Sequence, residues 1–170
     1  MTNDLPAHWT AAIRRAPVVE SLEALYRDVA ARIEARGPAC WASGRCCNFA
    51  RAGHCLYATG LETAYTLAQC HRSRGVRDFD ATTLPLTRAV VDAALARGGC
   101  PFQVANLCGV HAIRPLGCRV YFCDRSAQEW QRELYEQAMA QLRALHDQHA
   151  IEYRYGEWRE MLGLFASDVP

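Results

Sequence analysis

The chain has 170 residues, of which 51% are hydrophobic and 22% charged, so it is long enough for one compact domain over residues 1–170. The formal net charge is +1, and all 19 Lys and Arg positions are Arg, spread along the chain rather than grouped. This distribution disfavours nucleic acid as a partner, and the absence of Lys excludes a lysine nucleophile or Schiff base.

The beginning of the chain contains an early acid and no apolar run of the signal-peptide kind, and no later segment is long enough to span a bilayer. We therefore expect a cytoplasmic protein without a membrane partner. Nine cysteines are many for such a chain, and thiols in a reducing compartment seldom form structural disulfides. The odd count would also leave one thiol unpaired, so metal or redox chemistry is the favoured interpretation.

Apolar periodicity predicts an N-terminal helix over residues 18–36, which ends at Gly37. A short strand over 56–59 is followed by a helix over about 61–70, with Thr59 as its N-cap and Glu62 more plausible as a cap partner than as a base. Residues 71–85 form a polar connector.

Thr87 begins another predicted helix, which Gly98 and Gly99 end immediately before Cys100. Residues 126–148 form the longest predicted helix, within a C-terminal helical segment over 126–165. The predicted fold class is α+β, mainly α-helical, with helices packed around two irregular cysteine-rich loops that contain short β segments.

Eight of the nine cysteines fall into two segments that we take as a metal-binding core over residues 40–123. Thiolates are the preferred ligands of zinc and of iron–sulfur clusters, and nearby glycines allow a loop to bend around such a centre. Two adjacent cysteines, such as Cys46 and Cys47, seldom ligate the same metal ion. The pair is compatible with one polynuclear centre and with two separate sites. The candidate ligands are Cys40, Cys46, Cys47 and Cys55 in the first segment, and Cys100, Cys108, Cys118 and Cys123 in the second.

The order of these motifs resembles the YkgJ family of cysteine-cluster proteins, described as a zinc- or iron-chelating domain with a CxxCxxCC motif. Here the first motif is CWASGRCC from Cys40, and the second half is CPF from Cys100, then Cys108, then RPLGCR from Arg114. The resemblance covers about half of the chain and implies metal binding. The family's second cysteine is Ser43 here, so Ser43, a water or Cys55 could occupy that position, or it could stay open.

Other residues carry weaker expectations. Cys55 and Cys123 are less certain ligands than the rest, and Cys70 is expected to be a core or free thiol. His54 and His111 lie beside cysteines but are more often hydrogen-bonding residues than ligands. Arg114 and Arg119 are expected to lie behind the ligands and to stabilise thiolate or sulfide charge, with a structural salt bridge as the alternative.

The leading hypothesis is an iron centre, most plausibly iron–sulfur, held by cysteine thiolates and possessing a redox role. One alternative is a structural or interaction module stabilised by zinc. Another is a metalloenzyme with an open coordination position at Ser43. Because the chain contains no P-loop, GxGxxG, HExxH or GxSxG motif, the sequence leaves open whether it is an enzyme.

Overall fold

The computed structural model describes residues 4–40, 43–72 and 86–167 and is mainly α-helical with two short antiparallel strand pairs, as the sequence predicted. The connector predicted over 71–85 lies mostly outside the described residues. The single-domain organisation stays a prediction. The α-helices are α1 (Leu5–Ala12), α2 (Ala16–Arg36), α3 (Phe49–Ala52), α4 (Gly60–Arg72), α5 (Arg88–Ala96), α6 (Leu116–Val120), α7 (Gln128–Gln148) and α8 (Trp158–Gly163).

Three short 3₁₀ helices and four strands complete the described elements. They are η1 (Arg45–Cys47), η3 (His111–Ile113) and η4 (Arg125–Ala127), with β1 (Tyr57–Thr59), β2 (Gln103–Val104), β3 (Leu107–Cys108) and β4 (Tyr155–Glu157).

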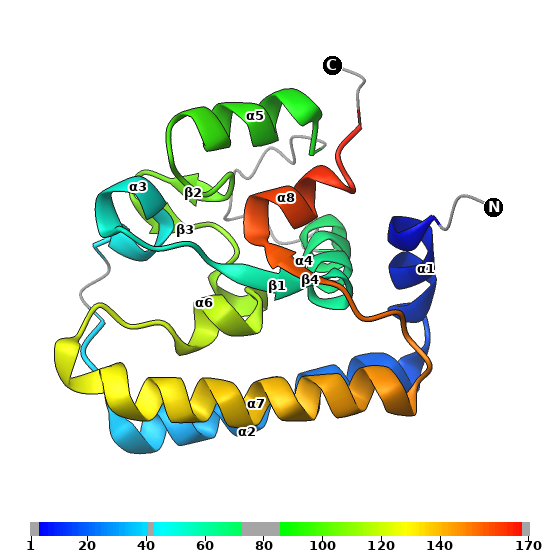
Figure 1. Ribbon diagram of the computed structural model, residues 1–170, viewed down its shortest axis with the longest axis horizontal. Helices are drawn as coiled ribbons and strands as arrows, with labels where there is room; N and C mark the ends of the chain where they lie inside the picture. Colours follow the sequence, from blue (N-terminus) through cyan, green and yellow to red (C-terminus); the bar gives the residue numbers. More distant parts are fainter. Residues whose placement is uncertain (1–3, 41–42, 73–85, 168–170) are drawn as a thin grey trace.

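The long helices α2 and α7 lie side by side and run in opposite directions along one side of the molecule (Figure 1). Each presents an apolar stripe at helical spacing, and residues such as Leu22 and Leu142 are completely buried between the helices and their neighbours. Gly37 ends α2 in the left-handed conformation, with φ +56°. The predicted helix over 18–36 is therefore confirmed, and it starts two residues earlier.

The start of α4 is a reciprocal capping arrangement. The backbone N–H of Thr59 donates to Glu62 Oε2 at 2.9 Å, and the N–H of Glu62 donates to Thr59 Oγ1 at 3.3 Å. Glu62 is only 1% exposed, and its other oxygen accepts hydrogen bonds from the N–H of Leu116 at 2.7 Å and from the Tyr26 hydroxyl at 3.1 Å. One carboxylate therefore connects α4, α2 and the beginning of α6.

Strand β1 pairs with β4 near the opposite end of the chain, with Tyr57 opposite Glu157. Glu157 then caps α8 by accepting from the N–H groups of Arg159 and Glu160. The prediction of a helical segment over 126–165 is wrong at β4, since the return to β1 requires an extended segment there. Helix α1, which the apolar pattern did not predict, begins at an Asp4 cap and buries Trp9 completely.

Across the described ranges, we find no helix with the length and hydrophobicity that a bilayer crossing requires.

Candidate metal centre

The first cysteine segment is ordered by a tight turn at Gly44, which has φ +65° and precedes η1. A side chain at this position would overlap the carbonyl oxygen of Asn106 in the second segment, so only glycine allows the two backbones to approach so closely. The side-chain amide of Gln103 also donates to the Gly44 carbonyl oxygen at 2.9 Å. The two cysteine segments therefore meet directly at Gly44.

Two backbone hydrogen bonds join the same segments at a second place. The N–H of Cys100 donates to the Cys47 carbonyl oxygen at 2.8 Å, and the N–H of Ala50 donates to the Gly98 carbonyl oxygen at 2.9 Å. Gly98 has φ +67°, and a side chain added there would overlap the side chain of Ala50. This pairing places Cys47 beside Cys100, although the two residues are far apart in the chain.

The second segment contains the hairpin β2–β3, whose two turn residues Ala105 and Asn106 both have positive φ, at 47° and 64°. Such a turn matches the twist of a two-residue hairpin and returns the chain so that Cys108 lies opposite Gln103. The following chain forms α6, which carries Cys118. Short β segments were expected here from the sequence, whereas η3 and α6 were not.

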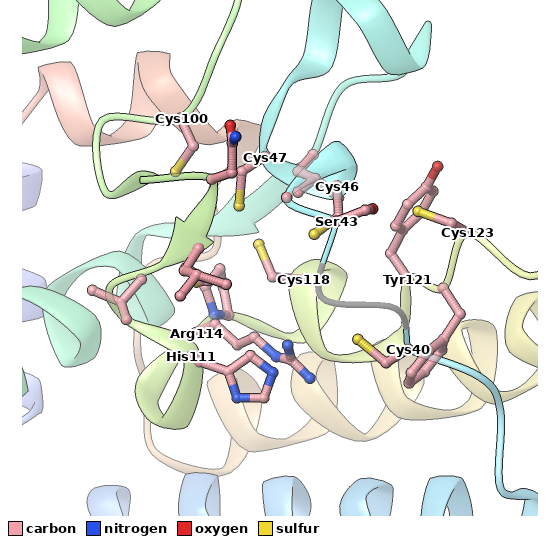
Figure 2. Close-up of a pocket in the computed structure, with 18 of the residues that line it drawn as sticks. Cys40, Ser43, Cys46, Cys47, Cys100, His111, Arg114, Cys118, Tyr121 and Cys123 are labelled. Atoms are coloured by element: carbon pink, nitrogen blue, oxygen red, sulfur yellow. The ribbon is translucent and has the colours of Figure 1, made fainter. Parts of the chain in front are cut away.

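These elements enclose a cavity of about 130 Å³ that we call the cysteine cavity. A water molecule needs roughly 10–15 Å³ of such volume, so this space is several times larger than one small ion or water requires. Figure 2 shows the sulfur atoms of Cys47, Cys100 and Cys118 directed toward the same space. Seven cysteines line the cysteine cavity: Cys40, Cys46, Cys47, Cys100, Cys108, Cys118 and Cys123.

Cys47 is at the centre of this group, because its thiol lies within reach of the sulfurs of Cys46, Cys100 and Cys108 and can donate its one proton to any one of them. Acceptance of that hydrogen bond, with the positive charge of Arg114, lowers the pKa of Cys46 to about 6 or that of Cys108 to about 7. The same interactions raise the pKa of Cys47. The thiol that accepts from Cys47 is thus predisposed to ionise near neutral pH, which is the state in which sulfur ligates metals.

Cys118 lies in a different environment. Burial and the nearby negative sulfurs of Cys100 and Cys108 raise the pKa of its thiol well above the ordinary value. A thiol in this setting stays protonated unless a positive charge enters the cavity. A bound cation would provide that charge.

Arg114 and Arg119, which the sequence placed together, are separated in the structure. Arg114 lines the cysteine cavity, and its buried Nε has no hydrogen-bond partner among the described residues. Arg119 instead stacks on the Tyr26 ring at 3.9 Å from the ring centroid and donates to the Ala112 carbonyl oxygen. Arg114 is therefore the arginine positioned to compensate thiolate charge.

Cys55 and Cys70 are not among the residues that line the cavity. Cys55 is exposed. Cys70 is partly buried at the end of α4, where burial, together with the charge of Cys108, raises its pKa to about 11. Ser43 also lines the cavity.

The two histidines differ in their surroundings. His111 lines the cavity beside Arg114, and burial lowers the pKa of its imidazole. His54 stacks on Tyr121, with 4.2 Å between ring centroids, and its Nε2 is 3.2 Å from the Cys46 carbonyl oxygen. His54 thus supports the first cysteine segment from outside the cavity.

Trp158 is a cavity residue that the sequence pattern did not predict. It is 1% exposed, forms part of the cavity wall, and its indole helps to lower the pKa of the Cys100 thiol. The pairing of β4 with β1 positions it, and its own backbone N–H donates to the Leu56 carbonyl oxygen at 2.8 Å. The segment before Trp158 carries no cysteine, so no local signal connected it to the site.

As the side chains stand, no three His, Cys, Asp or Glu groups in the described part of the chain form a set that could hold a metal ion. The chain matches no protein-family model, and neither the curated proteins nor the solved structures include a significant match.

Proposed function

We propose that this protein binds an iron centre, of the iron–sulfur kind, through the thiolates of the cysteine cavity. The observation that carries the proposal is the convergence of two distant cysteine segments on one space, where Cys47 lies beside three other thiols. All-sulfur donors suit iron–sulfur clusters and zinc better than hard cations. The motif resemblance to the YkgJ family supports the same proposal.

The thiol set fits such a centre by its chemistry. Cys46, Cys47, Cys100, Cys108 and Cys118 are the proposed ligands, and Cys40 and Cys123 line the same cavity farther from this group (Figure 2). Ligation requires the sulfurs to turn from one another toward a shared ion, which a change of side-chain rotamer provides. Arg114 would offset the accumulated negative charge, and the indole of Trp158 would donate to a ligating sulfur.

Iron is favoured over zinc because the cavity offers more thiols than the four that a single structural zinc ion takes. An iron–sulfur centre would supply one-electron redox chemistry. The protein's own residues would exclude water from one side, since Trp158, Leu56 and Val110 in the wall are all buried.

Ser43 favours a second candidate function, a metalloenzyme with an open coordination position. A hydroxyl ligates iron or zinc more weakly than a thiolate, so a centre beside Ser43 would keep one exchangeable position. Ser43→Cys should then retain or tighten metal binding and suppress any activity. Unchanged activity in that variant would exclude the open position.

The direct test is anaerobic purification followed by elemental analysis for iron, zinc and acid-labile sulfide, with a visible absorption spectrum. Iron together with sulfide and a broad visible band supports the proposal. Stoichiometric zinc without colour supports the structural-module alternative, and a protein without either metal contradicts both.

Two cysteine variants localise the centre. Cys100→Ser removes a buried thiol at the middle of the group and should lower bound metal to less than about one tenth of the wild-type level. Cys55→Ser makes the same chemical change at the exposed cysteine outside the cavity and should leave metal content unchanged. Equal losses in both variants would show that the ligand set has been misassigned.

A further inference from the structure

A second concavity adjoins the cysteine cavity, and we call it the polar cleft. Its volume is about 430 Å³, within the roughly 300–1,000 Å³ typical of small-molecule sites. Arg45, Asn48 and Arg51 from the first cysteine segment form one part of the lining, and Gln103 and Asn106 from the hairpin β2–β3 form another.

The polar cleft presents hydrogen-bond donors and positive charge. Arg45 and Arg51 bring two guanidinium groups, which bind carboxylate and phosphate oxygens in a forked geometry. Among the described residues that line the cleft none is Asp or Glu, and neither arginine forms an ion pair with a described carboxylate. Within the described residues, the cleft therefore holds two cations without a paired carboxylate, beside three side-chain amides.

The local structure holds these groups in place. The Asn48 side-chain oxygen accepts from the N–H of Arg51 at 3.2 Å, which leaves the amide nitrogen of Asn48 available. Gln103 is fixed by its hydrogen bond to the Gly44 carbonyl oxygen at 2.9 Å. Because the same contact joins the two cysteine segments, the cleft forms only when the cysteine cavity is assembled.

We infer that the polar cleft binds the oxyanion group, phosphate or carboxylate, of a small anionic ligand. The cleft and the cavity share Ser43 and Cys123, so an anion held by Arg45 and Arg51 lies directly beside the cysteine cavity. The inference goes beyond the proposed metal binding and does not require it. If both hold, the centre acts on or senses a ligand that carries an acidic group.

The test is isothermal titration calorimetry of the protein as purified, at constant ionic strength, with inorganic phosphate and, separately, with succinate. One saturable site for either probe is expected, and the preferred probe identifies phosphate or carboxylate as the recognised group. Arg45→Gln and Arg51→Gln should each weaken binding about ten-fold, as expected for losing one charge-assisted interaction.

Arg27→Gln is the matched control, because Arg27 is exposed on α2, outside the cleft lining, and the substitution removes the same charge. Its affinity should equal that of the wild type. The absence of saturable binding for both probes would overturn the inference, as would an equal loss in Arg27→Gln, which would indicate general ionic attraction.

Metal analysis of the same samples separates this inference from the proposed function. Anion binding by a protein without bound metal would support the inference about the cleft and contradict the proposed metal centre. Bound metal in a protein that binds neither probe would support the metal centre and contradict the inference about the cleft. Circular dichroism of each variant confirms that a lost affinity is not a lost fold.

Discussion

The helical layer of α2 and α7 and the cysteine cavity are stabilised in different ways. In the layer, apolar side chains repeat along both helices, so many burial contacts contribute in parallel. Around the cavity, short segments are joined by individual contacts: Gly44 against Asn106, Cys100 with Cys47, and Glu62 with the start of α6. Substitutions in the layer should therefore lower the stability of the protein without changing its metal binding. Substitutions at the individual contacts around the cavity should change metal binding.

The largest loss of stability is expected in the helical layer. Leu142→Ala should lower the free energy of unfolding by about 3 kcal/mol, since Leu142 is completely buried and the truncation leaves a cavity. Urea unfolding measures this change. Metal content per folded protein should stay at the wild-type value, and a parallel loss of metal would show that the layer and the site are not independent.

A smaller loss with a larger effect on the site is expected at Gly44. Gly44→Ala should destabilise the protein by about 2 kcal/mol, because the left-handed φ of +65° disfavours a side chain and the new methyl group overlaps Asn106. Its metal content should fall as the two cysteine segments separate.

Gly53→Ala is the control for backbone conformation. Gly53 has φ +70° but no atom within 4 Å of an added Cβ. Gly53→Ala should therefore lower the free energy of unfolding by about 1 kcal/mol, without loss of metal. If the two variants behave alike in both measurements, the contact between Gly44 and Asn106 does not organise the site.

The smallest expected effect is a pH dependence at Glu62. Burial raises the pKa of this carboxyl above its ordinary value of 4.5, so the folded state holds the proton more tightly than the unfolded state. The resulting stabilisation is complete below pH 4.5 and is lost as the pH rises through the folded-state pKa. Glu62→Gln cannot titrate at this position.

Urea unfolding of the wild type and Glu62→Gln between pH 4.5 and 8 measures this contribution. The stability of the wild type relative to the variant should decrease as the pH rises. A constant difference across this range would show that the pKa of Glu62 is the same in the folded and unfolded states.

Much of the fold was predictable because its signals are local. The apolar spacing of α2 and α7, the capping pair Thr59 and Glu62, and the Thr87 cap of α5 each involve residues within a few positions of one another. The mainly helical fold class follows from them. Strand β4 could not be found in this way, because its extended conformation depends on pairing with β1.

The sequence predicted which cysteines line the cavity better than it predicted how the surrounding residues are arranged. Clustering identified the seven cysteines that line the cavity, but spacing left both Cys55 and Cys123 as less certain ligands, and of these two only Cys123 lines the cavity. Arg119 was grouped with Arg114, and its stacking on Tyr26 depends on the packing of α6 against α2. Trp158 comes from a segment that only tertiary structure brings to the cysteines, and the donors of the polar cleft lie within the two cysteine segments but meet only in the folded chain.

The pairing of β1 with β4 also determines when the site can be completed. Trp158 takes its place in the cavity wall through that pairing, and it follows Cys123, the last cysteine of the second segment. During synthesis on the ribosome, both cysteine segments therefore emerge before this part of the wall exists. Until β4 has paired with β1, the thiols are open on that side to water or to a metal donor.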